Sequence, residues 1–523
     1  MPYTGQSKFL EVACGGGLLL DHSSKDMPYG AATVLQNYEA NISGGYRRMS
    51  GFSKYDTSAL AGSGQVLGIT TLGTNVIACR GANVQYGAGS GWTSITTGRT
   101  STGRYHFDKF NITGTEKIIM ASGTAGTNPA ATWDGSNYIL MNGAIGSGSG
   151  TAPTNPTDVA EHKDHMFYLQ NNTITVSAPF QENDFDPANG SAEFIVPDTG
   201  VKLKSFRDEL YIFCVKSIYK LVGDNVDNFS VRDVADDIGC VSGWSIQEVG
   251  GDLVFLSPDG LRPVSGTARI DDINLSSISK QVQERIRGLG ESNYVFSSNL
   301  VRNKSQYRLW WSAKDDAALP GISLLEENSA GLIGVLKGAA GAEGTGWEYS
   351  DMKGIKPSYA TSNYIAGVET VLHGGWDDGF IYQQEVDITG TGFAGGTIPS
   401  IWRSSDIIMQ DSGIRKRPKH VTLNVKWEGY IAPSLDVEYD FGNTAIAQPA
   451  AYTITTPTHI STYGFASTTY GGVSVYSLDP MGLDRMWVEG SGFAVALKIT
   501  DTSTNSSFTI LGFQIEYTEG GRK

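Results

Sequence analysis

A repeated strand–turn–strand unit constrains the fold of this chain more than any other feature of its sequence. Each unit has a short apolar strand, a tight turn and a second strand followed by Gly or Pro. The units recur about every 43 to 45 residues, which is the length of one blade of a β-propeller. The three clearest units are His165–Leu169 with Ile174–Val176, Glu209–Phe213 with Ile218–Leu221, and Asp252–Leu256 with Leu261–Val264. The repeat predicts a binding scaffold.

Similar signals lie on both sides of this region. Asp-Gly turns at Asp134 and Asp378 supply the positive φ angles that tight hairpins need. With 65 Gly among 523 residues and 18% charged residues, the chain is rich in turns and poor in charged helix faces. We expect six or seven blade-like units in all. Further strand pairs are predicted at Val76–Cys79 with Val84–Tyr86 and at Lys117–Met120 with Tyr138–Leu140.

The strand pattern lengthens after residue 398. Val421, Leu423, Val425 and Trp427 alternate with polar residues, as in a strand with one buried face. The predicted fold class is mainly β: a β-propeller plus an antiparallel β-sandwich-like platform domain, with few helices. The predicted division is an N-terminal segment contributing to the platform (1–60), the propeller (61–397) and the C-terminal platform (398–523).

Two stretches interrupt the repeat, near 143–156 and 325–347. The first reads as a Gly/Ser/Thr/Pro connector, and the second as an insertion between late blades. One amphipathic helix is expected where Ile278, Val282 and Ile286 follow one another at intervals of four residues. We expect this helix to pack on a sheet; the alternative is a helix that binds a partner.

The charge and the cysteines exclude several classes of protein. A net charge of −15 argues against broad electrostatic attraction to nucleic acid or to an anionic membrane. The four cysteines, at 14, 79, 214 and 240, show no metal-ligand spacing and are expected to be reduced and buried. The apolar run Leu18–Leu20 is too short for a signal peptide or a membrane span, so no stable membrane insertion is expected.

Candidate chemical motifs have simpler structural explanations. Glu161–His165 holds two histidines and two carboxylates, which could bind a metal, but it precedes a blade strand and is expected to be a solvated turn. The pairs Asp236-Asp237 and Asp271-Asp272 are expected in turns and caps rather than as an acid and a base. Gly390–Gly395 completes G-x-G-x-x-G but lacks a following helix, so a linker is expected. We therefore predict no catalytic, cofactor-binding or metal-binding residue, no cofactor and no enzymatic activity.

Several segments, taken in order, resemble one family of viral proteins. The opening segment holds Gln36 and Asn37, then Arg47 and Arg48 shortly before Gly51. It resembles the start of the tail nozzle proteins of short-tailed bacteriophages, also called tail tubular protein B, whose relatives include the packaged-DNA stabilisation proteins. Met49 and Ser50 separate Arg48 from Gly51, a small departure from the family pattern. Later matches include Phe206–Phe213 with Ser217–Tyr219, Ile238–Ser242 with Gly239, Gly250–Gly260 with Asp259 and Gly260, and Arg415–Lys419.

This resemblance implies a structural component of the virion that assembles in the host cytoplasm. Copies of the chain would form a ring, a hexamer by analogy with the family, below the adaptor and portal. The ring would retain the packaged viral DNA without sequence-specific contacts and would provide the channel for genome ejection. Tail fibres or spikes are further expected partners.

The only dense basic cluster in this acidic chain is Arg415, Lys416, Arg417 and Lys419. We expect these side chains to dock on an acidic neighbouring copy or on the adaptor. The alternatives are a contact with DNA in the channel and a surface without a partner.

A second class of function remains open. The chain could be a carbohydrate-binding or depolymerising tail-associated β-propeller. The segment from Gln36 to Gly51, which a secreted glycosidase would not need, favours the structural role.

Overall fold

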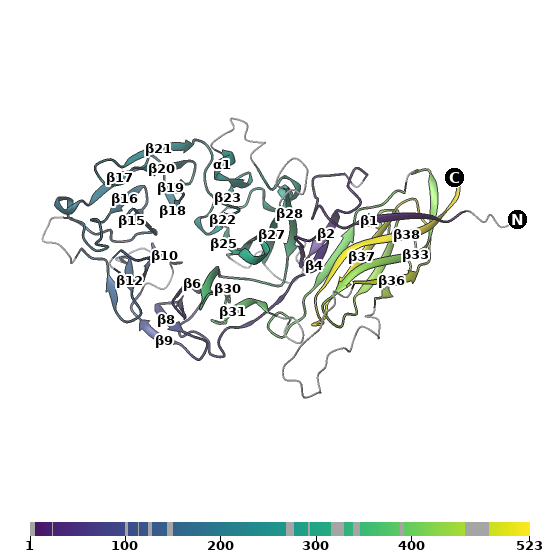
Figure 1. Ribbon diagram of the computed structural model, residues 1–523, viewed down its shortest axis with the longest axis horizontal. Coiled ribbons are helices and arrows are strands. Elements are labelled where there is room, and N and C mark those ends of the chain that lie inside the picture. Colours follow the sequence, from purple (N-terminus) through teal and green to yellow (C-terminus); the bar gives the residue numbers. More distant parts are fainter. Residues whose placement is uncertain are drawn as a thin grey trace.

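The chain folds into two β-rich parts, a propeller and a platform, joined end to end (Figure 1). The structure is a computed structural model. It describes residues 6–23, 25–99, 103–112, 114–123, 128–143, 150–267, 277–290, 293–314, 329–337, 346–386, 392–409, 411–454 and 481–522. The predicted fold class is confirmed: the described residues are mainly β, with a propeller, a sandwich-like platform and a few helices of three or four residues.

Seven small sheets surround the propeller axis in the described part of the chain (Figure 1). Five of them have four strands, one has three, and one is the beginning of a larger nine-stranded sheet. In chain order the sheets are β6–β9 (Val66–Leu72, Asn75–Arg80, Asn83–Gly87, Thr93–Thr96); β10–β13 (His106–Phe110, Lys117–Ala121, Ala131–Trp133, Tyr138–Leu140); β14–β17 (Asp158–His162, His165–Gln170, Thr173–Val176, Ala192–Ile195); β18–β21 (Gly200–Phe206, Glu209–Cys214, Ile218–Val222, Ser230–Ala235); β22–β24 (Gln247–Val249, Asp252–Ser257, Gly260–Pro263); β25–β28 (Tyr294–Val301, Gln306–Ala313, Ser329–Lys337, Gly346–Met352); and β29–β31 (Tyr359–Ile365, Val368–Gly374, Ile381–Val386) with β5 (Gly51–Lys54).

The first strand of each sheet lies nearest the axis, and neighbouring sheets pack face to face. Separate clusters of buried apolar side chains fill the spaces between adjacent sheets. The seventh sheet is completed by β5, which comes from the beginning of the chain and pairs with β31. The ring is therefore closed by strands far apart in the sequence.

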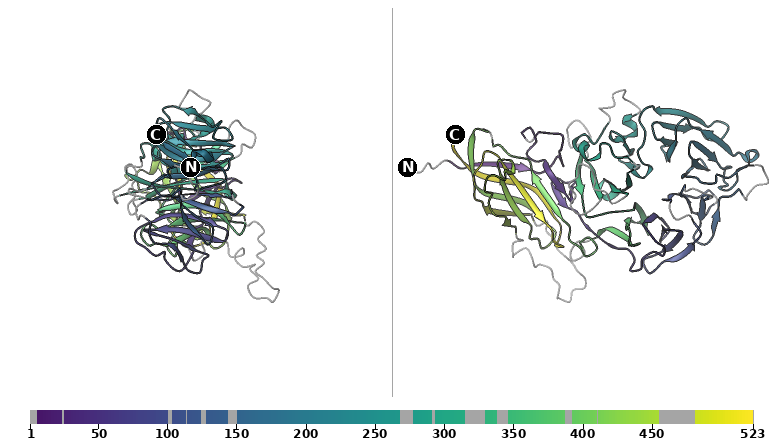
Figure 2. Two further views of the ribbon diagram at one scale, coloured as in Figure 1. Left: turned by 90° about the vertical axis from the view of Figure 1, so that its left-hand side faces the viewer. Right: turned by 180° about the vertical axis from the view of Figure 1, so that it is seen from behind.

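The platform is a sandwich of two antiparallel sheets over a shared apolar core (Figure 2). Core side chains include Trp402, Leu423, Leu497 and Phe513, each fully buried. One sheet has β3 (Tyr38–Ala40), β4 (Tyr46–Arg48), β38 (Phe508–Arg522), β33 (Ile414–Trp427) and β36 (Met481–Trp487), with β1 (Lys8–Ala13) also paired to β38; the other has β2 (Ala32–Gln36), β32 (Ser400–Ser404), β37 (Val495–Asp501), β34 (Ser434–Tyr439) and β35 (Tyr452–Thr453).

One sheet runs through both parts of the molecule. Strand β28, the last strand of the β25–β28 blade, pairs in parallel with β2 of the platform through Gln36 and Asp351. The nine strands therefore form one continuous sheet.

The predicted boundaries at 60/61 and 397/398 stay predictions. Of the N-terminal segment 1–60, β1–β4 belong to the platform sheets and β5 to a propeller sheet.

The predicted insertion at 325–347 is wrong where the structure describes it. Residues 329–337 form β27, a central strand whose Leu332, Ile333 and Val335 are buried. Its glycines make the strand hard to recognise from sequence. A Cβ at Gly331 would lie 2.6 Å from the Trp310 ring, so glycine is needed for a large aromatic neighbour rather than for a loop.

Two smaller predictions also need correction. The expected helix over 278–286 is only a 3₁₀ turn, η3 (Lys280–Val282), and one α-turn, α3 (Gln283–Ile286), because the Ile278 N–H donates to the Leu261 carbonyl instead of entering a helix. The strand β11 pairs with β12 and not with β13, so one strand between them was missed.

In the 143–156 connector, residues 144–149 lie outside the described residues, and 150–156 contain no strand or helix. All four cysteines are buried and free.

Phe213 and Phe255 test the packing between adjacent blades. Both are fully buried, and their rings, from β19 and β23, have centroids 5.4 Å apart. Replacing either with Ala should lower the free energy of unfolding by about 3–5 kcal/mol, measured by urea denaturation. Ile195→Ala is the control, because Ile195 on β17 is 66% exposed. Unchanged denaturation midpoints for both Phe variants would contradict the packing.

Candidate functional site

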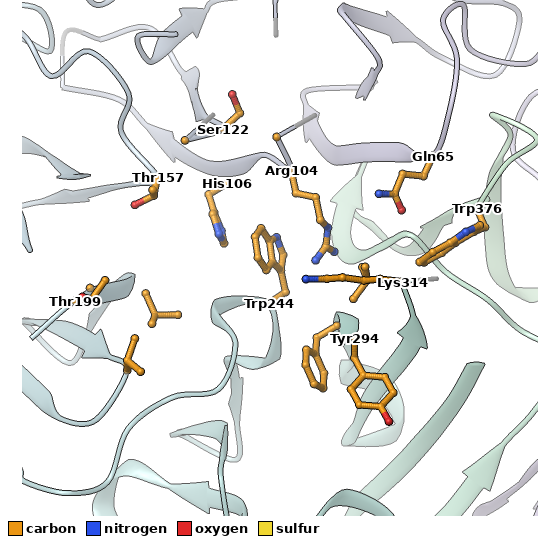
Figure 3. Close-up of a pocket in the computed structure, with 17 residues that line it drawn as sticks. Gln65, Arg104, His106, Ser122, Thr157, Thr199, Trp244, Tyr294, Lys314 and Trp376 are labelled. Atoms are coloured by element: carbon orange, nitrogen blue, oxygen red, sulfur yellow. The ribbon is translucent and has the colours of Figure 1, made fainter. Parts of the chain in front are cut away.

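A candidate site is a cavity of about 650 Å³ at one end of the propeller axis (Figure 3). The inner strands begin at this end, so residues from the starts of several strands converge there. All seven sheets, or the loops that lead into them, contribute to its wall. The lining side chains that Figure 3 labels are Gln65, Arg104, His106, Ser122, Thr157, Thr199, Trp244, Tyr294, Lys314 and Trp376.

A stack of three side chains lies at the middle of this cavity. The Arg104 guanidinium lies 4.1 Å from the centroid of the Trp244 ring, and the His106 ring stacks on the same indole with centroids 4.4 Å apart. In Figure 3 the indole is drawn between the other two groups. Arg104 also donates to the Ser297 hydroxyl (3.2 Å) and to the Ser358 carbonyl (2.9 Å). These contacts link strands β10, β25 and β29 across the axis.

A buried ion pair supports the other side of the stack. The Lys202 ammonium contacts Asp158 Oδ1 (2.8 Å) and His106 Nδ1 (2.9 Å). Asp158 is fully buried and also accepts the Leu203 N–H (2.5 Å). Burial, with Lys202 and Arg104 nearby, holds the pKa of His106 well below its ordinary value, so the imidazole is neutral at pH 7. Its neutral state fits a neighbourhood that already carries two cations.

The described lining of the cavity is cationic and carries no carboxylate. Arg104 and Lys314 are its charged residues, and hydroxyl and amide groups make up most of its other polar side chains. Aromatic side chains at Trp244, Tyr294 and Trp376 supply apolar surface. Such a mixture can bind a ligand that is anionic, rich in hydroxyls and partly apolar.

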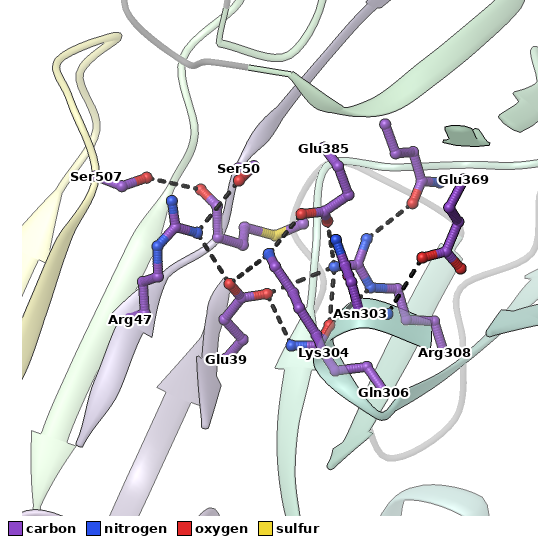
Figure 4. Close-up of polar contacts among 12 residues, drawn as sticks. Glu39, Arg47, Ser50, Asn303, Lys304, Gln306, Arg308, Glu369, Glu385 and Ser507 are labelled. Atoms are coloured by element: carbon purple, nitrogen blue, oxygen red, sulfur yellow. Dashed lines mark hydrogen bonds and ion pairs between the residues drawn. The ribbon is translucent and has the colours of Figure 1, made fainter. Parts of the chain in front are cut away.

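A second polar cluster joins the propeller to the platform (Figure 4). At its centre is Glu39 of β3, whose side chain is 2% exposed. Its carboxylate contacts Arg47 (2.9 Å) on the platform and Lys304 (2.7 Å) on the propeller, and it accepts a hydrogen bond from Gln306 (3.0 Å). Glu39 therefore bridges the two parts of the molecule.

Glu385 of β31 extends this cluster on the propeller side. It pairs with Lys304 (2.5 Å) and with Arg308, which is almost fully buried. Burial alone would raise the pKa of both carboxyls, but Lys304, Arg308 and, for Glu39, Arg47 outweigh it. The pKa of Glu39 and that of Glu385 therefore lie below their ordinary value.

The residues that carry the family resemblance lie mostly at this junction. Asn37, at φ 55°, is fully buried; its side chain donates to the Lys353 (2.9 Å) and Pro399 (3.0 Å) carbonyls and accepts the Lys353 N–H (2.9 Å). Gln36 donates to the same Pro399 carbonyl (2.7 Å). These bonds fix the corner where β2 leaves the platform.

Arg48 is a buried tether within the platform. Its guanidinium donates to the carbonyls of Ile398 (3.0 Å), Ser503 (2.6 Å) and Asn505 (3.0 Å), and it lies 3.5 Å from Asp501. Arg48 thus links the segment before β32 with the loop after β37. Gly51 begins β5, directly after this tether.

The other motif positions shape propeller turns. A Cβ at Gly239 would lie 1.9 Å from the Val215 carbonyl oxygen, so only glycine fits. Gly260 has φ 136°, and Asp259 before it accepts hydrogen bonds from Ser257 (2.8 Å) and from Nε of the buried Arg262 (2.9 Å). These three residues have structural roles in the contacts that the structure describes.

The predicted basic cluster is divided by the alternation of strand β33. Arg417 is exposed, and Arg415 donates to Ser491 through two nitrogens (3.0 and 2.9 Å). Lys416 is 1% exposed and donates to the Asp411 carbonyl. Lys419 is half-buried. The four residues therefore do not form one exposed patch, and their role as an interface stays a prediction.

The remaining candidate motifs are placed as follows. His162 and His165 face each other across the β14–β15 hairpin and are both buried, so the prediction of a solvated turn is wrong for them. Asp236-Asp237 lies beyond β21, Asp271-Asp272 lies outside the described residues, and 392–395 form a turn.

The described ranges contain no cluster of three His, Cys, Asp or Glu positioned for a metal ion. None of the helices formed by the described residues could span a membrane.

The sequence pattern indicated neither the axial cavity nor the Glu39 cluster. Arg104, Trp244 and Lys314 come from three different sheets, and nothing in their local sequence marks them as neighbours. Arg104 lies just before β10, Trp244 just before β22 and Lys314 just after β26, but none of these three strands was predicted from the sequence.

Comparison with known proteins finds distant structural similarity. No protein-family model matches the chain, and no curated protein matches it in sequence. One similar structure is the extracellular domain of a putative hybrid two-component system from B. thetaiotaomicron, with TM-score 0.39, 9% identity and coverage of 68% of this chain and 45% of that one. Another is an ancestral GH74 enzyme, with TM-score 0.39, 10% identity and coverage of 69% and 53%. The chain thus spans about half the length of these two proteins.

A third similar structure, like the GH74 enzyme, bears on the prediction that this chain has no enzymatic activity. It is the exo-β-1,3-galactanase of Phanerochaete chrysosporium, with TM-score 0.25, 9% identity and coverage of 90% of this chain and 100% of that one. Because two of the similar structures are enzymes that act on carbohydrates, the prediction that this chain has no enzymatic activity is not upheld. A similarity this distant assigns no activity to the chain.

The Glu39 cluster predicts an acid-sensitive junction. Since the pKa of Glu39 lies below its ordinary value of 4.5, the stability that it contributes is present above that pH and is lost as pH falls through the folded-state pKa. At pH 7, Glu39→Gln should cost about 3–5 kcal/mol of unfolding free energy, because it leaves buried cations unpaired.

The cost of Glu39→Gln should shrink as the pH is lowered below the ordinary value of 4.5, and urea denaturation at a series of pH values measures it. Glu209→Gln is the control, because its pair with Lys220 is partly exposed and should contribute only about 0–1 kcal/mol. A cost for Glu39→Gln that does not depend on pH would contradict the assignment.

Proposed function

We propose that this protein is a structural component of a phage tail, a nozzle subunit whose copies form a ring below the adaptor and portal. One observation carries the proposal. The segment from Gln36 to Gly51, on which the family resemblance depends, supplies the buried residues that join the propeller to the platform. A resemblance confined to surface loops would carry less weight than one that covers the junction.

The architecture suits a wall that must resist pressure. A sheet shared by both parts and a buried charge cluster between them oppose bending at the junction. Propellers have only short, protected sheet edges and present loops on two faces, which leaves surfaces for several partners. Assembly into a ring requires heterologous contacts, in which different surfaces of adjacent copies meet.

The remaining parts of this proposal follow from the family resemblance. We propose six copies in the ring, contacts with the adaptor, the portal and tail fibres or spikes, and a channel that retains packaged DNA without reading its sequence. The location would be the virion, after assembly in the host cytoplasm.

A second candidate function is carbohydrate binding by the propeller of a tail-associated protein. The axial cavity favours it, because its size and its aromatic, hydroxyl-bearing and amide side chains suit a sugar. The two functions are compatible, since a tail protein can also contact the host surface.

Electron microscopy of the purified protein, alone and mixed with its portal and adaptor, tests the structural role. We expect rings that attach below the adaptor. Single copies that stay unattached in the presence of portal and adaptor would overturn the proposal.

Arg417 and Lys419 test the predicted interface. Exposed ion pairs contribute about 0–1 kcal/mol each, so Arg417→Ser with Lys419→Ser should leave monomer unfolding nearly unchanged. Ring attachment should weaken and particles should leak DNA, as measured by pull-down with the adaptor and by nuclease sensitivity of the packaged genome. The control, Arg232→Ser with Lys220→Ser, removes the same charge from the paired strands β20 and β21. Normal attachment and normal DNA retention in the Arg417/Lys419 variant would refute the interface.

A further inference from the structure

The charge of the axial cavity is opposite to that of the protein. The chain has a net charge of −15, yet the described lining residues include Arg104 and Lys314 and no Asp or Glu. In Figure 3 the ends of both cationic side chains extend toward the middle of the cavity, beside Trp244. A cavity lined in this way attracts anions and disfavours cations.

Arg104 is held in place before any ligand arrives. Its guanidinium stacks on Trp244, and hydrogen bonds to Ser297 and Ser358 fix it from two other sheets. A planar guanidinium that is already oriented loses little entropy when it binds a carboxylate or a sulfate. The low pKa of His106, caused by burial and then by Lys202 and Arg104, is consistent with a positive potential here.

The rest of the lining fits a ligand that carries many hydroxyl groups. Ser122, Thr157 and Thr199 bear hydroxyls, and Gln65 bears an amide. Two buried atoms in this wall, Gln65 Oε1 and Trp244 Nε1, have no hydrogen-bond partner among the described residues. Buried polar atoms of this kind are rare unless a water or ligand satisfies them.

We propose that the axial cavity binds an anionic carbohydrate, with Arg104 and Lys314 contacting its carboxylate or sulfate group. This inference rests on the second function proposed above and specifies its ligand class. The hydroxyl and amide groups of the wall bind the sugar hydroxyls, and the aromatic side chains cover its apolar faces. The net charge of −15 works against binding of the same polymer elsewhere on the chain.

Isothermal titration calorimetry of the full chain tests the proposal with a set of matched probes. The probes are trigalacturonic acid, its neutral methyl ester, a sulfated heparin tetrasaccharide and inorganic phosphate. We expect at least one of the two anionic saccharides to bind, the neutral ester to bind about tenfold more weakly or not at all, and affinity to fall as salt is raised.

Variants locate the site. Lys314→Gln should weaken the anionic saccharide about tenfold and leave the ester unaffected, and Arg104→Gln should do the same if it folds. Arg232→Gln, an exposed change of equal charge on β21, is the control and should bind as the parent does. Circular dichroism and thermal melting check that Lys314→Gln keeps the fold.

The possible failures are distinguishable. If neither anionic saccharide nor the ester binds, both carbohydrate binding and this inference are overturned. If the acid and the ester bind equally, carbohydrate binding stands and the anionic assignment fails. If Lys314→Gln and Arg232→Gln have the same effect, the site lies elsewhere, and if phosphate binds as tightly as the saccharides, the cavity recognises charge and not sugar.

Discussion

Glu39 is the carboxylate around which the two parts of the molecule are joined. It is almost completely buried, and a buried charge is tolerated only when its partners are fixed in place. Those partners come from β4, from η4 (Arg302–Lys304) and from β26, so the propeller and the platform must both be folded for Glu39 to be neutralised. Nearby, Asn37 and Arg48 satisfy backbone carbonyls that the junction would otherwise leave unpaired. The junction is thus specified by polar groups, which tolerate fewer alternative arrangements than an apolar contact would.

The pattern of the sequence was sufficient to predict the fold class but not the sites. Alternating residues such as Val421 and Leu423, and the repeat near Phe213 and Phe255, reflect local burial that period and spacing reveal. Strand β27 was missed because Gly331 and Gly334 make room for aromatic rings that are remote in sequence. Arg104 and Trp244 meet only because the propeller closes, and no local signal encodes that closure. The significance of Asn37 and Arg48 was indicated only by resemblance, and their hydrogen bonds required the three-dimensional structure.

The axial cavity and the junction are separate in their chemistry. The stack of His106, Trp244 and Arg104 ties the inner strands to one another, and the cavity around it is open at one end of the axis. The Glu39 cluster lies at the other end of the β25–β26 hairpin, where η4 joins the two strands. A nozzle role would depend mainly on the junction, and a carbohydrate-binding role mainly on the cavity. Substitutions at one should therefore leave the other measurable.

The closure of the seventh blade by β5 has a consequence for biosynthesis. Strand β5 ends at Lys54 and its partner β31 begins at Ile381, so roughly 330 residues must leave the ribosome before the two can pair. At about 5–20 residues per second, this interval is roughly 15 s to a minute. Strand β1 waits longer still, because its partner β38 lies at the other end of the sequence. During that time the nascent chain carries unpaired N-terminal strands, which makes it a natural client for a chaperone.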